Sequence, residues 1–194
     1  KSGKPQSLDH AQIITTGLVG DRDFAVIDED GRMLTARECP MLLEVEAKIM
    51  DDMIHFKCKG EFITVPRKTV SSKKRTGILF GQSVGGLELD KRIQKWFSKC
   101  MGVSCHVVEI NAVYMRQMED QFIDITYTDA APILLTSEAS LRDLNNRMTL
   151  PVGMNRFRPN IVVKGGNPFE EDDWKSLKIG TCEFEISHHC PRCV

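Results

Sequence analysis

The feature that most constrains the fold is an alternation of apolar and polar side chains, in short runs separated by turn residues, from Ala11 to Val70. Side chains of a β-strand point alternately to its two faces, so this period indicates strands that bury one face. Short turns such as Asp28-Glu29-Asp30-Gly31 and Asp51-Asp52 join consecutive runs, which favours antiparallel hairpins. The predicted strands are residues 24–27, 33–35, 43–50, 53–57 and 62–65.

Later in the chain the apolar spacing changes to three and four residues, which is typical of amphipathic helices. Residues 89–101 form the first such stretch, and Gly102 is placed to end it. Residues 138–148 form the second, with Ser137 as the predicted N-cap. We therefore predict an α+β fold rich in β-structure, with helices between groups of antiparallel strands. The later strands are predicted over 103–110, 160–163 and 182–186.

A chain of 194 residues can bury a substantial core, as one large domain or as two small ones. Residues 111–124 are polar, contain methionine and show no clear period. We place a boundary there and predict two domains, over 1–110 and 111–194. Because the sequence begins at Lys1 rather than Met and stops directly after Cys193-Val194, we expect both domains to continue beyond the two ends.

The composition excludes several classes of protein. A formal net charge of −1 argues against a general nucleic-acid-binding protein, because such proteins usually carry a basic excess. No apolar run approaches the roughly 18 residues that span a bilayer, and no signal-peptide pattern stands at the start. The seven cysteines are an odd number scattered along the chain, which suits a reducing compartment.

Two runs of charge interrupt the apolar pattern. Five basic residues lie within Arg67–Arg75, for which we predict a solvated loop. The functional alternative is a patch that attracts an acidic partner or an anionic membrane surface. The acidic run Glu170–Asp173 is also predicted to be a solvated loop, with Trp174 turned inward.

Side chains that can bind a metal or react lie closest together in the C-terminal sequence His188-His189-Cys190-Pro191-Arg192-Cys193. Two thiols three positions apart in a tight turn can form a redox disulfide, or bind a soft or borderline metal as thiolates. Adjacent histidines diverge in an extended segment, so at most one of them faces the cysteines. A structural zinc ion would need two more ligands, and the spacing to Cys182, Cys100 or Cys105 matches no common zinc pattern.

Four other short stretches carry groups that suit an anion. Lys1-Ser2-Gly3 combines an ammonium, a hydroxyl and a flexible backbone, and in Gly20-Asp21-Arg22 the carboxylate can orient the guanidinium. Thr35-Ala36-Arg37 ends a predicted strand. Arg158 and Asn160, two positions apart, can point to one side and hold an anion and an amide-bearing ring. Taken singly, these stretches favour ordinary surface turns and a frayed terminus over a binding site.

Six short motifs follow one another along the chain: Lys1-Ser2, Gly17-Leu18-x-Gly20-Asp21-Arg22-Asp23-Phe24, Thr35-Ala36-Arg37, Ser137-Glu138-Ala139-Ser140-Leu141, Phe157-Arg158-Pro159-Asn160 and Cys190-x-x-Cys193. Together they resemble the MOSC family of molybdenum-cofactor proteins, and within it the mitochondrial amidoxime-reducing branch. The resemblance runs through essentially the whole chain. It implies a MOSC N-terminal β-domain followed by the first part of a MOSC β-barrel domain.

In that family a molybdopterin cofactor lies between the two domains, and one protein cysteine holds the molybdenum. The resemblance assigns this ligand, and with it the catalytic role, to Cys193. Fixed cations and amide groups suit a phosphate and a polar ring system, and a thiolate suits molybdenum. The residues that the resemblance places around the pterin and its phosphate are Lys1, Ser2, Arg22, Arg158, Asn160 and Arg192.

The resemblance also implies an activity, which is the reduction of N-hydroxylated compounds such as amidoximes to the parent amidine. Electrons are expected singly from cytochrome b5 and its NADH-dependent reductase. A eukaryotic member is expected at the mitochondrial outer membrane, facing the cytosol through an anchor outside this sequence. A bacterial member would be cytoplasmic.

The sequence departs from the family pattern at Ala130 and Ala131, where hydroxyl residues are common, at Asp90, where a glycine is common, and at Phe80, where relatives can carry His. These differences concern substrate contacts more than cofactor binding. One alternative is a cofactor-handling module without reductase activity, like the C-terminal domain of molybdenum-cofactor sulfurases. Another is a thiol redox or zinc protein in which both terminal cysteines matter equally.

Overall fold

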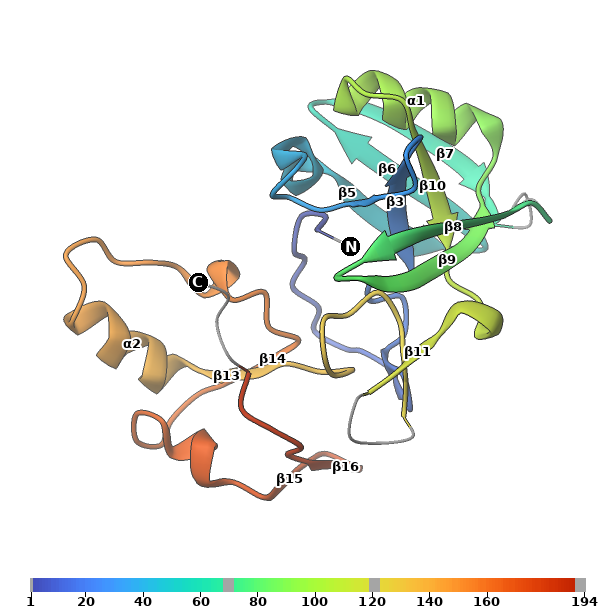
Figure 1. Ribbon diagram of the computed structural model, residues 1–194. Helices are drawn as coiled ribbons and strands as arrows, with labels where there is room; N and C mark the ends of the chain where they lie inside the picture. Colours follow the sequence, from blue (N-terminus) through green and yellow to red (C-terminus); the bar gives the residue numbers. More distant parts are fainter. Residues whose placement is uncertain (1, 68–71, 119–122, 191–194) are drawn as a thin grey trace. The chain divides into compact units, whose positions relative to one another are not determined.

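The computed structural model describes residues 2–67, 72–118 and 123–190 (Figure 1). The chain divides into two compact units, Lys1–Pro132 and Ile133–Val194, which we call the N-terminal unit and the C-terminal unit. Many short strands and two α-helices in the described residues confirm the predicted β-rich α+β class. In the same residues, no helix combines the length and the apolar character that crossing a membrane requires.

A five-stranded antiparallel sheet in the order β4-β3-β10-β9-β8 organises the N-terminal unit (Figure 1). The predicted hairpin of residues 24–35 is confirmed by the pairing of β3 with β4. β10 lies beside β3, and a second hairpin, β8–β9, completes the sheet. The strands are β3 (Phe24–Asp28), β4 (Met33–Leu34), β8 (Lys74–Leu79), β9 (Gln82–Glu88) and β10 (Cys105–Glu109).

A three-stranded antiparallel sheet, β5-β6-β7, follows the predicted meander. Asp51 and Asp52 connect its first two strands with φ of 48° and 61°, the left-handed conformation that tight hairpin turns require. The strand predicted from residue 43 begins later, because Pro40–Glu44 forms a 3-10 helix, η1, that starts with proline. The strands are β5 (Glu46–Met50), β6 (Met53–Cys58) and β7 (Glu61–Pro66).

Helix α1, Lys91–Met101, confirms the first predicted helix. The Asp90 carboxylate caps its start by accepting a hydrogen bond from the Arg92 backbone N–H, and Gly102 ends it at φ 72°. Its apolar face buries three side chains, which are Ile93, Phe97 and Met101.

Two apolar clusters fill the N-terminal unit. The first joins α1, η1 and β6 to one face of β3 and β10, and Phe56 packs edge-to-face on Phe97 with ring centroids 4.9 Å apart. The second covers the other face around Tyr127. In β3, Val26 enters the first cluster while Ala25 and Ile27 enter the second. The central strands are therefore buried on both faces, whereas the alternating pattern predicted one.

The β8–β9 hairpin was not predicted, because the glycines of β9 interrupt the alternation of apolar and polar side chains that indicates a strand. Gly85 and Gly86 are both buried. A Cβ atom on Gly86 would lie 2.3 Å from the carbonyl oxygen of Glu109 and 2.6 Å from the Tyr127 hydroxyl. Only glycine allows this close approach of two strands.

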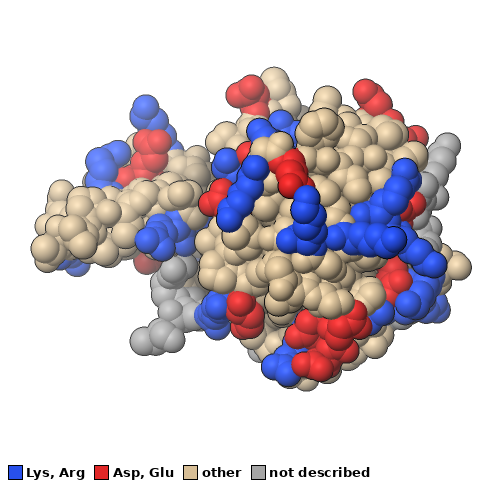
Figure 2. Space-filling model, turned by 90° about the horizontal axis from the view of Figure 1, so that it is seen from above, with Lys and Arg blue, Asp and Glu red and all other residues tan. Residues whose placement is uncertain are grey.

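The prediction of a solvated loop over 67–75 is wrong at both ends, while residues 68–71 lie outside the described residues. Nε of Arg67 donates to Glu109 Oε1 at 2.8 Å, and Nε of Arg75 donates to Glu88 Oε1 at 2.6 Å. Both carboxylates belong to residues only 7% exposed. Arg67 and Arg75 therefore neutralise two buried carboxylates. On the face shown in Figure 2, Lys and Arg side chains also lie among Asp and Glu side chains.

The C-terminal unit consists of short elements. Helix α2, Glu138–Asn146, confirms the second predicted helix, and Ser137 Oγ caps it by accepting from the backbone N–H groups of Ala139 and Ser140. β13 (Leu135–Ser137) and β14 (Ile161–Val163) pair in parallel, which corrects the expectation of antiparallel strands.

The second strand pair of this unit is antiparallel and precedes the terminal cysteines: β15 (Ser176–Ile179) and β16 (Cys182–Glu185). The acidic run Glu170–Asp173 forms a 3-10 helix, η5, followed by a half-buried Trp174. The remaining short elements are β1 (Ile13–Ile14), β2 (Gly17–Leu18), η3 (Ala112–Tyr114), β11 (Arg116–Gln117), β12 (Asp124–Ile125) and η4 (Met154–Arg156).

Candidate cofactor-binding site

The candidate residues belong to both units. Lys1, Arg192 and Cys193 lie outside the described residues, so the predicted metal ligand and these two cationic contacts stay predictions. Ser2 and Arg22 belong to the N-terminal unit. Arg158, Asn160 and Cys190 belong to the C-terminal unit.

Ser2 is hydrogen-bonded to the Thr35-Ala36-Arg37 motif, through a residue 34 positions later in the chain. Its hydroxyl oxygen accepts a hydrogen bond from the Ala36 backbone N–H at 3.2 Å, and Ser2 is only 9% exposed. The Lys4 backbone N–H donates to the Val45 carbonyl oxygen at 2.7 Å, which holds the following residues in place. The structure therefore brings together two motifs that the sequence presented separately.

Arg22 lies in a turn directly before β3, where its guanidinium pairs with the Asp21 carboxylate as predicted. The Arg22 side chain is 17% exposed. Its backbone carbonyl accepts from the Tyr127 N–H at 3.4 Å, and the Asp21 carbonyl accepts from Thr126 Oγ1 at 3.4 Å. This cation is thus held by a carboxylate and by a segment a hundred residues later in the chain.

A partly buried carboxyl group, that of Asp23, follows directly after Arg22. Burial raises the pKa of Asp23 to about 6, and the carboxylates of Glu109 and Asp21 act in the same direction. The Arg67 guanidinium, whose Nη2 lies 4.0 Å from Asp23 Oδ2, opposes the shift. One side of the Arg22 turn therefore carries a group that changes charge near neutral pH.

Asn160 is anchored at the start of the parallel strand pair. Its backbone N–H donates to the Leu134 carbonyl at 2.8 Å, and its side-chain Oδ1 accepts from the Leu134 N–H at 3.0 Å. These two hydrogen bonds fix the position of the Asn160 side chain at the start of the strand pair.

Ser2, Arg22 and Arg158 share an unusual backbone conformation, with φ of 65°, 55° and 54°. Left-handed conformations cost of order 1–3 kcal/mol in residues that carry a side chain, and they gather at functional sites. Four of the other five such residues among those described lie in hairpin turns, and the fifth precedes η5. These five are Asp51, Asp52, Lys59, Phe80 and Phe169.

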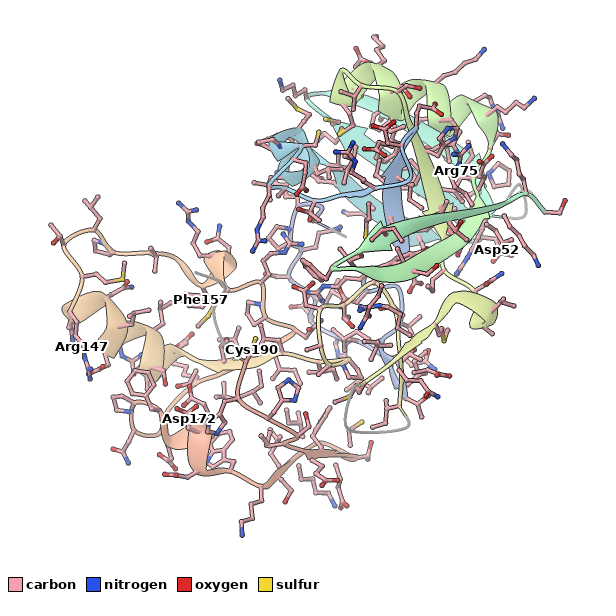
Figure 3. All side chains as sticks on the ribbon, viewed as in Figure 1. Asp52, Arg75, Arg147, Phe157, Asp172 and Cys190 are labelled. Carbon is pink, nitrogen blue, oxygen red and sulfur yellow. The ribbon has the colours of Figure 1, made fainter. Side chains whose placement is uncertain are left out.

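The described part of the terminal loop presents an exposed thiol at Cys190 (Figure 3). The two histidines have different partners, since His188 Nδ1 lies 3.0 Å from Ser187 Oγ and His189 Nε2 lies 2.9 Å from the Asp172 carbonyl oxygen. Among the described residues, no group of three or more His, Cys, Asp and Glu side chains is arranged to hold a metal ion.

Arg116 and Thr128 are further polar residues near the Arg22 turn, and no sequence pattern indicated either of them. Arg116 donates to Gln82 Oε1 at 2.9 Å and to the Thr128 carbonyl oxygen, and burial lowers the pKa of its guanidinium. Within the described residues, Arg116 Nε and Thr128 Oγ1 are buried without a hydrogen-bond partner. Arg116 lies in the polar stretch 111–124, which offered no periodic signal that could have identified it.

Comparison with known proteins covers both units. A family model described as the MOSC N-terminal beta barrel domain matches residues 1–104, and a MOSC domain model matches residues 123–194. The predicted domain boundary after residue 110 falls in the interval that neither model matches, whereas the compact units divide after Pro132. That boundary stays a prediction.

Individual relatives extend the match along the chain. Mitochondrial amidoxime reducing component 2 of Bos taurus is 36% identical over 208 residues, covering 100% of this chain and 62% of the relative. The protein of the same name from Rattus norvegicus is 37% identical over 190 residues, covering 92% and 56%. Molybdenum cofactor sulfurase of Oryza sativa subsp. japonica is 28% identical over 222 residues, covering 100% and 26%.

The chain thus spans less than two thirds of the length of these relatives. The N-terminal family model alone matches more than half of the sequence, and the second model follows it in the order that the motifs predicted. The chain belongs to the MOSC family.

Proposed function

We propose that this chain is part of a molybdenum-cofactor-dependent reductase that converts N-hydroxylated compounds, such as amidoximes, to the parent amidine. The observation that carries the proposal is the similarity of the whole chain to proteins named amidoxime reducing components, at 36% identity in the Bos taurus relative. The two MOSC family models, matched in order, support it.

The donor groups of the described candidates fit an anionic pterin cofactor. Arg22 and Arg158 supply fixed cations for a phosphate, Ser2 a hydroxyl, and Asn160 an amide for a polar ring. Three of these four residues hold left-handed backbone conformations, the kind of strain found at preorganised sites. In the proposal Lys1 and Arg192 add two further cationic contacts.

The thiolate of Cys193 is proposed as the protein ligand of the metal, because soft thiolates suit such metals. When bound, the cofactor would supply the redox centre at which the N–O bond is reduced. The residues of this chain would bind and orient it, with Asp21 holding the Arg22 guanidinium in position.

The remaining parts of the proposal concern partners, location and domains. We propose a cytochrome b5-type donor, supplied by an NADH-dependent reductase, and a small N-hydroxylated substrate. The mitochondrial names of the relatives support a mitochondrial location, at the outer membrane and facing the cytosol in a eukaryotic cell. A bacterial protein would be cytoplasmic. The domains are proposed as 1–110 and 111–194.

A cofactor-handling module without reductase activity is the second candidate. The rice molybdenum cofactor sulfurase favours it, since that protein also aligns with the whole of this chain. Both candidates require the cofactor to bind, but only the first requires electrons to pass from NADH to an amidoxime.

The decisive experiment measures molybdenum per protein in the full-length parent, expressed in a host that makes the cofactor. We expect near-stoichiometric metal in the parent, almost none in Cys193→Ser, and near-parental metal in Cys190→Ser. Equal losses from the two cysteine variants would instead support the thiol or zinc interpretation. Reduction of benzamidoxime with NADH, cytochrome b5 and its reductase then separates the two cofactor-binding candidates.

Arg158 offers a sharper test of the cofactor contacts. Arg158→Gly removes the charge and relieves the left-handed backbone, whereas Arg158→Lys keeps the charge in the same strained position. We expect Arg158→Gly to lose most bound molybdenum while its thermal midpoint stays within a few degrees of the parent or rises. Retention of the metal in Arg158→Gly would remove this residue from the site.

A further inference from the structure

A small cavity lies between the last turn of α1 and the β6–β7 hairpin, apart from every candidate cofactor residue of the N-terminal unit named above. Its volume is about 260 Å³. The side chains that line it include two thiols, two ammonium groups and one carboxylate. They are Cys58, Lys59, Glu61, Lys99 and Cys100.

The two thiols come from elements that are distant in sequence but packed on one core. Cys58 ends β6, is 2% exposed and belongs to the first apolar cluster. Cys100 lies in the last turn of α1, is partly exposed, and packs against the same cluster. Both are reduced.

The thiols are also direct neighbours. Burial, followed by the charge and the hydrogen bond of Cys58, raises the pKa of Cys100 to about 11. Burial raises the pKa of Cys58, and a hydrogen bond with Cys100 offsets part of that rise. The geometry agrees with this coupling, because both thiols line the same small cavity and pack against the same apolar cluster.

An ion pair holds the two elements together beside the thiols. Lys99 Nζ lies 2.9 Å from Glu61 Oε1 and 3.1 Å from Oε2, which links α1 to the first residue of β7. Lys59, in the turn between β6 and β7, has a left-handed φ of 47°. The ion pair and the tight turn therefore connect the end of α1 to the β6–β7 hairpin beside the cavity that both thiols line.

We propose that Cys58 and Cys100 are a redox-sensitive dithiol, which closes to a disulfide and ties the end of α1 to the β6–β7 hairpin. The oxidant is a small-molecule disulfide such as oxidised glutathione. The inference is independent of the cofactor and of the proposed reductase activity.

The chemistry balances in two exchange steps. The thiolate of Cys100, the more exposed of the pair, attacks one sulfur of the oxidant, whose S–S bond breaks and releases one small thiolate. The thiolate of Cys58 then attacks the Cys100 sulfur of the mixed disulfide and releases the second. Two protein thiols are oxidised, one small disulfide is reduced to two thiols, and the two protein thiol protons end on the released thiolates.

The surroundings of the two cysteines make disulfide formation slow at neutral pH and faster at alkaline pH. Lys59 and Lys99 favour the thiolate forms, whereas Glu61 and Glu44 oppose them, and burial outweighs both. Below its pKa, the thiolate fraction of a cysteine rises tenfold for each pH unit. We expect the rate of closure to rise about 100-fold between pH 7 and pH 9.

The test incubates the folded chain with oxidised glutathione at pH 7, 8 and 9, blocks the remaining thiols with N-ethylmaleimide, and maps disulfide-linked peptides by mass spectrometry. We expect one linked pair, Cys58 with Cys100, that disappears on reduction. Cys100→Ser and Cys58→Ser should each abolish it. Because Cys58 is buried, Cys100→Ser decides the test if Cys58→Ser does not fold.

Cys39 and Cys105 provide the matched control, because both are buried in the same cluster but line no part of this cavity. A Cys39–Cys105 link in place of the proposed one, or a Cys58–Cys100 link that forms only in urea, would overturn the proposal. So would the absence of any link at pH 9 while the exposed Cys190 is modified.

Formation of the Cys58–Cys100 disulfide should also raise the thermal stability of the N-terminal unit. The link closes a long loop, so the thermal midpoint of the N-terminal unit should rise by about 5 °C or more and return on reduction. An unchanged midpoint in fully linked protein would refute the tethering of α1.

Discussion

The N-terminal unit buries apolar side chains on both faces of its five-stranded sheet, whereas Ser137 and Ala139 are the only buried residues among those described in the C-terminal unit. The C-terminal unit relies instead on local hydrogen bonds. Asn145, for example, donates to the Val152 carbonyl at 3.0 Å and accepts from its N–H at 2.8 Å. A fully buried aromatic side chain contributes several kcal/mol, but a hydrogen bond adds only about 1 kcal/mol net.

This contrast divides the candidate site as well. Arg22 is held in a unit with a dense core, whereas Arg158, Asn160 and Cys190 belong to a unit stabilised mainly by caps and turns. Regions with few buried apolar contacts open locally at low free-energy cost. The C-terminal unit should therefore gain more from a bound ligand, because binding stabilises the ordered state.

The largest expected effect is a cavity in the N-terminal core. Phe97 is 2% exposed and contacts both Phe56 and Trp96, so Phe97→Ala should lower the free energy of unfolding by about 3–5 kcal/mol. The matched change Leu144→Ala, at a half-buried position of α2, should cost less than about 1.5 kcal/mol.

One tryptophan lies in each unit, so urea unfolding can follow them separately. Trp96 reports on the N-terminal unit in a Trp174→Phe background, and Trp174 reports on the C-terminal unit in a Trp96→Phe background. Phe97→Ala should shift the Trp96 transition alone. A common shift of both transitions would mean that the two units unfold together, which would break the comparison.

The next effect is a pH dependence confined to the N-terminal unit. The pKa of Asp23 is raised to about 6 in the folded chain, so the folded state binds more protons than the unfolded state between about pH 4 and pH 6. Stability should therefore fall by about 2–3 kcal/mol as pH rises through this window, relative to Asp23→Asn, and level off above it.

Glu88 supplies a control of opposite sign. Burial acts to raise its pKa, but hydrogen bonds from Arg75 and Lys73 outweigh burial and leave the pKa lowered. Its contribution is present above the unfolded pKa and is lost in acid, so Glu88→Gln should remove stability above about pH 5 only. If the free energy of unfolding had the same pH dependence in wild type and Asp23→Asn, the decrease between about pH 4 and pH 6 could not be assigned to Asp23.

A smaller effect compares two ion pairs. Removing Arg75 leaves the buried Glu88 carboxylate with Lys73 at 3.2 Å and His106 at 3.6 Å, so Arg75→Met should cost about 1–3 kcal/mol in urea unfolding. On α2, the exposed Arg142–Glu138 contact of 3.9 Å should be worth about 0.3–0.5 kcal/mol, measured with Arg142→Met. If Arg75→Met and Arg142→Met lowered the free energy of unfolding equally, burial of the carboxylate would not explain a difference between the two units.

The smallest expected difference between the two units is that between their helix caps. Asp90→Ala and Ser137→Ala each remove a side-chain cap and should each cost about 1 kcal/mol. Helix α1 buries three side chains, so its amide protons should stay protected from exchange, whereas α2 buries only Ala139 and should lose protection over its first turn. If both helices lost protection from amide exchange equally, packing of α1 on the core would not explain why the two helices should differ.

Much of the secondary structure was predictable because it depends on neighbouring residues. The β3–β4 hairpin, the Asp51-Asp52 turn, the two helices and the Ser137 cap follow from side-chain period and turn or cap residues, and the structure confirms each. The first helix begins two residues later than the predicted residue 89, after an Asp90 cap that was not predicted. The β8–β9 hairpin escaped prediction because Gly85 and Gly86 lack the side chains on which that period depends.

The candidate site was predictable only as residue identities. Nothing in the local sequence indicated that Ser2 would bond to Ala36, or that Arg22 would lie against Tyr127. The left-handed backbone at Arg158 was also hidden, because a residue before proline usually adopts an extended conformation.

The sequence by itself determined the β-rich class, the turns, the two helices and the MOSC resemblance, because each depends on residues close together along the chain. Only the tertiary structure decided that Arg67 and Arg75 meet buried carboxylates, that β9 packs glycine against β10, and that Cys58 and Cys100 line one cavity. These outcomes require residues distant in sequence to meet in one register. That register is set by packing and burial across strands, which no local pattern specifies.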